Sequence, residues 1–135
     1  MVYIECIPDG AYSSMSKQTA AYSCKRLGMP LVELRFFRPT KAEPVRNGRQ
    51  KGQPWKDSTY LKGVCTQRLL SGKADVWIRD GLHANDLIVT IAHEIFHLYE
   101  YKNDLATNEQ KAELFGRQVL SELAIQSQMI YYSFM

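Results

Sequence analysis

The stretch Leu87-Ile88-Val89-Thr90-Ile91-Ala92-His93-Glu94-Ile95-Phe96-His97-Leu98-Tyr99 carries the pattern H-E-x-x-H inside an apolar run. Residues four apart lie on the same face of a helix, so His93 and His97 can present two imidazole nitrogens to one metal ion. Glu94 stands one step around the helix, where a carboxylate can act on water without being a ligand. Charged groups in so apolar a segment need a partner or a metal. The stretch therefore predicts a metal centre on a buried helix, and the alternative is a self-satisfied polar cluster in the core.

The composition is that of a folded protein. The chain has 135 residues, of which 45% are hydrophobic and 11% aromatic, and this predicts a single domain over residues 1–135. No apolar stretch has the length of a membrane span, and the N-terminus lacks the features of a secretory signal, so we expect a cytoplasmic protein. The odd number of cysteines, without C-x-x-C spacing, predicts reduced thiols; they are Cys6, Cys24 and Cys65.

The charge is divided unevenly along the chain. Residues 1–80 hold 14 Lys/Arg and 7 Asp/Glu, a net of +7, whereas residues 81–135 hold 3 and 7, a net of −4. A basic half can indicate a nucleic acid or an acidic protein as partner, but a solvated surface with a basic loop is the preferred interpretation. That loop is residues 40–58, rich in Pro, Gly, Lys, Arg and Gln, which we expect to be long and exposed.

Periodicity predicts an α+β fold in which a short sheet of about three strands packs on the motif helix. A first helix is expected from 11 to about 27, ended by Gly28. The predicted strands are 31–37, 60–70 and 74–79, with a turn at 71–73.

Two more helix boundaries follow from capping signals. Asn85 is the expected N-cap of the motif helix, which should end near Lys102, and Thr107 with Gln110 forms a capping box for a last helix. The inward face of that last helix is spaced three and four apart: Ala112, Phe115, Gly116, Val119, Leu120 and Leu123. The apolar tail 128–135 should pack on the domain or form an interface.

A catalytic zinc needs a third protein ligand, and no histidine follows His97. Glu100 should point away from the face that His93 and His97 share. Glu109, in the first turn of the last helix, can reach the metal once the two helices pack, and it is the preferred ligand. Glu113, one turn later, is the alternative, or it accepts the second N–H of a ligand histidine.

The motifs carry a family resemblance. Ile91-Ala92-His93-Glu94-Ile95-Phe96-His97, followed by Glu109-Gln110-Lys111-Ala112-Glu113-Leu114-Phe115-Gly116, resembles the ImmA/IrrE-type metallopeptidases of the zincin group, whose pattern is A-H-E-x-x-H and then E-x-x-A-[ND]-x-F-A-x-x-L. The resemblance covers roughly residues 74–123. The chain departs from the pattern at Phe96, Glu113 and Gly116, where the family often has Gly, Asn or Asp, and Ala.

The resemblance implies a minimal zincin-like domain with His93, His97 and Glu109 as zinc ligands and Glu94 as general base. It also implies that the strand near 76–79 lies at a sheet edge, where an extended peptide could pair. The expected function is thus a zinc metallo-endopeptidase that hydrolyses a peptide bond in a protein substrate, such as a regulatory protein. The alternative is a metal-binding regulatory or interaction module that cleaves poorly. The sequence does not identify the group that would stabilise the oxyanion. The candidates are His83, Tyr99 and Tyr101, and a structural role is the preferred interpretation for each.

Overall fold

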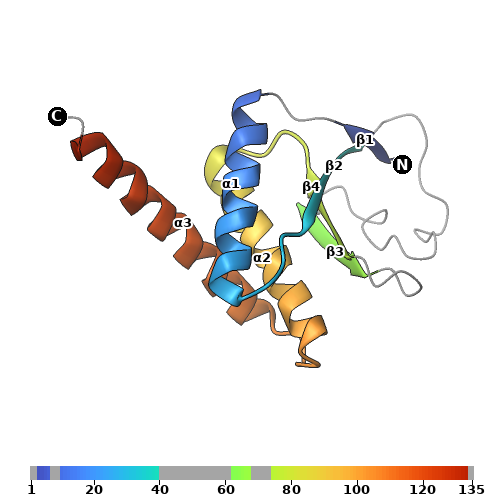
Figure 1. Ribbon diagram of the computed structural model, residues 1–135. Helices are drawn as coiled ribbons and strands as arrows, with labels where there is room; N and C mark the ends of the chain where they lie inside the picture. The colour runs from blue at the N-terminus through green and yellow to red at the C-terminus, as the bar shows by residue number, and fades with distance from the viewer. Residues whose placement is uncertain (1–2, 7–9, 40–61, 68–73, 134–135) are drawn as a thin grey trace.

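A computed structural model describes residues 3–6, 10–39, 62–67 and 74–133 (Figure 1). Over these residues the fold is α+β, as predicted. The elements follow in the order β1 (Tyr3–Cys6), α1 (Gly10–Leu27), β2 (Glu33–Pro39), β3 (Gly63–Gln67), β4 (Ala74–Arg79), α2 (Ala84–Lys102) and α3 (Glu109–Ser133). None of the helices in the described ranges is both long and apolar enough to cross a membrane.

The described strands form one sheet in the order β1-β2-β4-β3. β2 and β4 are parallel, and β1 and β3 flank them antiparallel. Two predictions were wrong here: the sheet has β1 as an additional strand, and β4 is not an edge. β3 pairs with the side of β4 that β2 leaves free, so β3 is the edge on this side, and its sequence neighbour β4 is interior.

The motif helix α2 lies at the centre of the molecule (Figure 1). One side of it packs on the sheet and α1, where Ile91 and Ile95 join Val76 and Ile78 of β4 in a fully buried cluster. The opposite side packs on α3 through a second cluster, which contains Ile88, Ala92, Phe115, Val119 and Leu123. Contact on both sides explains why the helix is apolar around most of its circumference.

The helix boundaries near the motif differ from the predicted caps. α2 begins at Ala84, and His83 is its N-cap in an extended conformation without a side-chain cap, so Asn85 lies inside the helix. Because the His83 carbonyl accepts the Leu87 N–H at 2.8 Å, the first turn already closes before Asn85. α2 ends at Lys102, as predicted.

The predicted capping box of α3 was also wrong by one residue. Asn108, rather than Thr107, is the cap, because its Oδ1 accepts the N–H of Lys111 at 3.0 Å. The predicted inward face of α3 is confirmed: Ala112, Phe115, Gly116, Val119 and Leu123 are buried, and Leu120 is partly buried.

The other predicted elements are confirmed in part. The helix expected from residue 11 is α1, and the strands expected at 31–37, 60–70 and 74–79 are β2, β3 and β4. The loop 40–58 and the turn 71–73 lie outside the described residues. α3 continues through most of the apolar tail to Ser133 and extends away from the other elements (Figure 1).

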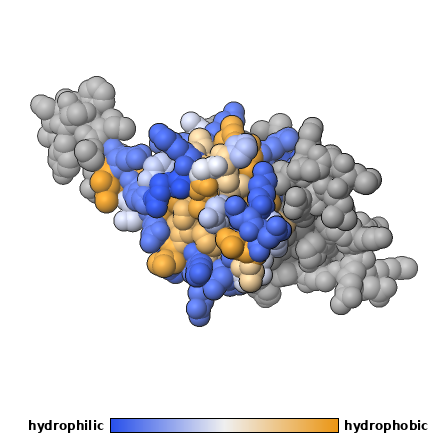
Figure 2. Space-filling model, turned by 60° about the horizontal axis from the view of Figure 1, so that its bottom comes forward, coloured by the Kyte–Doolittle hydropathy of each residue, from blue (hydrophilic) through white to orange (hydrophobic). Residues whose placement is uncertain are grey.

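The end of the molecule at which α2 stops and α3 starts exposes apolar side chains among hydrophilic ones (Figure 2). Over the described residues the exposed large apolar side chains are Leu31, Tyr101, Leu105, Leu114 and Ile125. Of these, Tyr101 and Leu105 belong to this end of the molecule by their position in the chain.

Candidate metal centre

The two motif histidines meet on one face of α2. His93 and His97 are one helical turn apart, and their Nε2 atoms lie 3.1 Å from each other. The rings are arranged edge to face, with centroids 4.8 Å apart. Both nitrogens therefore point toward the same position, as the four-residue spacing predicted.

Glu109 reaches that point from the first residue of α3. Its Oε2 lies 2.9 Å from His93 Nε2, and its Oε1 lies 2.9 Å from His97 Nε2. The carboxylate thus straddles the two imidazoles while its side chain is 77% exposed. This placement depends on the packing of α3 against α2, which brings together residues 12 and 16 positions apart in the chain.

The remaining ring nitrogens are each held by another carboxylate. His93 Nδ1 lies 3.2 Å from Glu113 Oε2, the contact expected if Glu113 accepts the second N–H of a ligand histidine. His97 Nδ1 lies 2.7 Å from Oε1 of Glu100. Glu100 does stay off the face shared by the Nε2 atoms, but sequence reasoning missed this contact. The sequence pattern that could have predicted the contact is a glutamate three residues after a histidine on an apolar helix.

The donor set fits a zinc ion. Four-coordinate zinc with bonds of about 2.0–2.2 Å places neighbouring ligand atoms roughly 3.3 Å apart. The separations of 2.9 to 3.1 Å among the two Nε2 atoms and the Glu109 oxygens are close to this spacing. In the tautomer with the proton on Nδ1, each imidazole donates to a carboxylate, and the two Nε2 lone pairs and the Glu109 oxygens converge on one point. A cation relieves that convergence.

Glu94 is buried beside this donor set. Its ligand oxygen and the ligand nitrogens of His93 and His97 all lie within 4.8 Å of one another, so Glu94 borders the point on which the histidines converge. Glu94 is 7% exposed, and its Oε2 has no hydrogen-bond partner. Burial raises the pKa of the Glu94 carboxyl, and the two histidines partly oppose this effect. The result is a basic, unpartnered carboxylate oxygen, which suits a general base better than a ligand.

A cleft of about 330 Å³ opens onto these groups. It is lined by α2, by the start of α3 and by the edge strand β3, and its lining residues are Lys62, Gly63, Asp86, Val89, Thr90, His93, Glu94, Glu109 and Glu113. β3 approaches α2 closely because Gly63 has no side chain. A Cβ at this position would lie 2.7 Å from Thr90 Cγ2 and 3.1 Å from Glu94 Cγ.

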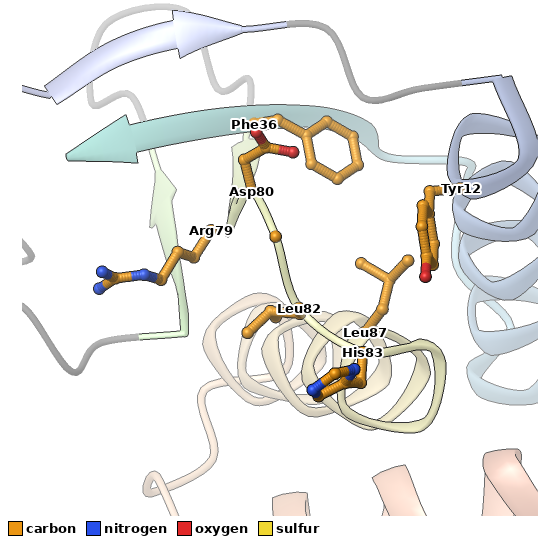
Figure 3. A pocket seen from close by; sticks show the side chains of 8 residues that line it. Tyr12, Phe36, Arg79, Asp80, Leu82, His83 and Leu87 are labelled. Atoms are coloured by element: carbon orange, nitrogen blue, oxygen red, sulfur yellow. The ribbon is translucent and has the colours of Figure 1, made fainter. Parts of the chain in front are cut away.

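A second pocket, of about 400 Å³, lies at the other end of α2 (Figure 3). Phe36, Leu82 and Leu87 line it together with Tyr12 and His83. His83 is ten residues before His93, which corresponds to about 15 Å along the helix. His83 therefore lines a different pocket from the metal centre, so this oxyanion candidate lies away from the donor set.

The two tyrosine candidates for the oxyanion differ in position. Tyr99 is two residues after His97, which puts it off the ligand face, and its ring packs on Phe96 with centroids 5.8 Å apart. Tyr101 is one turn after His97 on that face and is 44% exposed. Burial raises the pKa of Tyr101, and the nearby Cys65, Glu94 and Glu109 raise it further, so its hydroxyl stays protonated.

Comparison of the chain with protein-family models, with curated proteins and with solved structures finds no match.

Proposed function

We propose that this protein is a zinc-dependent metallo-endopeptidase with a zincin-like site, in keeping with the resemblance to the ImmA/IrrE-type enzymes. One observation carries the proposal: two histidine nitrogens and a carboxylate from a second helix converge to within 3.1 Å, beside a buried, unpartnered Glu94 oxygen. A core cluster whose members satisfy one another would not leave the Glu94 oxygen without a partner.

Each residue has a role in this proposal. His93, His97 and Glu109 hold the metal, and a bound zinc ion supplies Lewis-acid polarisation of a peptide carbonyl and acidifies water. Glu94 accepts a proton from the attacking water, because desolvation makes its carboxylate more basic, and passes the proton to the leaving amine. Tyr101 is the group that we assign to the oxyanion, because it lies one helical turn after His97 on the ligand face and its hydroxyl is protonated.

The substrate is proposed to bind as an extended chain along β3. Among the described strands, β3 has one side paired with β4 and the other side unpaired, and Gly63 at its start borders the cleft. A peptide added to this edge would form main-chain hydrogen bonds to β3 and run past Glu94. The cleft would then accept one side chain of the peptide.

The experiment pairs zinc content with proteolysis. Wild type, Glu94→Gln and Glu109→Ala are purified without chelator, and zinc per chain is measured by elemental analysis. Cleavage is assayed on an unfolded protein and on a mixed peptide library by mass spectrometry. Glu33→Gln, a substitution of the same chemistry at an exposed position of β2 outside the cleft lining, is the matched control.

The proposal expects about one zinc per chain in wild type, Glu94→Gln and the control, and less in Glu109→Ala. Cleavage should be lost in Glu94→Gln and kept in the control. Wild type that binds zinc but cleaves none of these substrates would favour the regulatory or interaction module. Wild type that takes up no zinc, even when zinc is added, would refute both functions.

A further inference from the structure

Glu100 is a buried carboxylate to which the proposed chemistry gives no role. It lies on α2 three residues after His97 and is 2% exposed. Both of its oxygens are engaged: Oε1 lies 2.7 Å from His97 Nδ1, and Oε2 accepts the main-chain N–H of Asn108 at 2.9 Å. A charged group is rarely buried to this extent, and here two hydrogen bonds compensate for its desolvation.

The main chain of Glu100 is also a fixed point of the loop between α2 and α3. Its carbonyl oxygen accepts the N–H of Leu105 at 2.9 Å and that of Asn103 at 3.3 Å. Together with the bond from Asn108, three N–H groups of residues 103–108 are therefore donated to this one residue. Because Asn108 caps α3, its position fixes where α3 begins.

We infer that Glu100 is the positioning residue that assembles the metal centre from two helices. By accepting the Nδ1–H of His97, it leaves the Nε2 lone pair free on the ligand face. By holding Asn108, it places the next residue, Glu109, against both imidazoles. This inference rests on the proposed metal centre, but the contacts of Glu100 with His97 and Asn108 involve no metal and can be tested on metal-free protein.

Glu113 provides the natural comparison. It also accepts from a ligand histidine, at 3.2 Å from His93 Nδ1, but its side chain is 45% exposed and also pairs with Arg117 on its own helix. Glu113 thus orients one ring, whereas Glu100 orients a ring and anchors the loop that carries the third ligand.

The substitution Glu100→Gln separates the two tasks. A glutamine keeps the size of the side chain but has one oxygen and one NH₂ group in place of two acceptor oxygens. If the oxygen stays with Asn108, the NH₂ group faces His97 Nδ1 and drives the ring proton to Nε2, the ligand atom. If the oxygen stays with His97, the N–H of Asn108 loses its acceptor and the start of α3 loosens.

The test is histidine NMR on metal-free protein, labelled with ¹⁵N and held near pH 8, above the ordinary pKa of histidine. The chain has 3 histidines, so a His83→Asn variant assigns one signal set and Glu113→Gln marks His93. Wild type should show His97 protonated at Nδ1. Glu113→Gln should leave that pattern unchanged, whereas Glu100→Gln should move the proton to Nε2 or speed amide exchange at Asn108.

Zinc affinity, measured by competition with a chelator, is the second readout. Glu100→Gln should weaken binding by about 10–100-fold. The inference is overturned if wild-type His97 carries its proton on Nε2, a result that does not depend on whether any variant folds. It is also overturned if folded Glu100→Gln keeps the wild-type tautomer, Asn108 exchange and zinc affinity. A wild type with His97 protonated at Nδ1 that binds no zinc would refute the proposed function and leave the role of Glu100 standing.

Discussion

The contact between α2 and α3 at Gly116 gives the sharpest prediction about the fold. Gly116 lies in α3 on the face that packs on α2, and a Cβ at this position would lie 2.7 Å from the main-chain oxygen of Val89 and 2.9 Å from its Cγ1. Ordinary contact begins near 3.4 Å, so Gly116→Ala must separate the helices by about 0.7 Å at this point.

The stability effect has two opposing parts. Alanine in a helix interior is favoured over glycine by about 1 kcal/mol. Overpacking costs about 1–3 kcal/mol, and the upper part of that range applies because the clash is with main chain, which cannot rotate away. The net loss is then about 1–2 kcal/mol, which corresponds to a fall in Tm of roughly 4–8 °C.

The same displacement should reach the metal centre. Val89 is four residues before His93 on α2, and Gly116 is seven residues after Glu109 on α3, so the clash pushes the two ligand-bearing helices apart. We expect zinc affinity to fall about tenfold, since such sites need their ligands held within about 0.5 Å.

The assay is thermal unfolding by circular dichroism on metal-free protein, followed by zinc competition with a chelator. Ser121→Ala, at an exposed position of the same helix, is the matched control and should change Tm by little. Gly116→Ala protein with a Tm at or above that of wild type and with unchanged zinc affinity would refute the packing argument.

Three further outcomes are expected. Ile95 is fully buried between the helices and the sheet, so Ile95→Ala should lower the free energy of unfolding, measured by chemical denaturation, by about 2–5 kcal/mol. A loss below 1 kcal/mol would contradict its place in the core. Burial raises the pKa of Cys65 to about 12, so iodoacetamide near pH 8 should label this thiol only after the protein unfolds. Mass spectrometry measures the labelling, and rapid labelling of the native protein would contradict the burial of Cys65. The hydrogen bond from Tyr22 (2.5 Å), together with Arg26, lowers the pKa of Glu122 in the folded chain. The link between α1 and α3 therefore stabilises the fold above the unfolded-state pKa near 4.3 and weakens as pH falls through the lowered folded value. Glu122→Gln should reduce the fall in the free energy of unfolding as the pH is lowered through this range. An unchanged pH dependence would rule the link out.

Local pattern was sufficient for most of the elements and for the shared face of His93 and His97. Helical spacing depends only on the chain itself, so the four-residue interval already brings the two rings together. Buried faces were predictable for the same reason, as the spacing of Ala112, Phe115 and Val119 on α3 illustrates. Helix starts were less predictable, since His83 is the N-cap of α2 in place of Asn85, and Asn108 caps α3 in place of Thr107.

Contacts between elements were decided only by the tertiary structure. The sheet order depends on which side of β4 the strand β3 occupies, and nothing within either strand specifies that β4 is interior. The contact of Glu109 with both imidazoles requires α3 to cross α2 at Gly116, and the role of Glu100 requires the loop 103–108 to fold back onto it. The sequence by itself determined which residues are able to hold a metal. The packing of α3 on α2 decided that they meet, because a distance between two helices is set by the side chains between them and not by the period of either one.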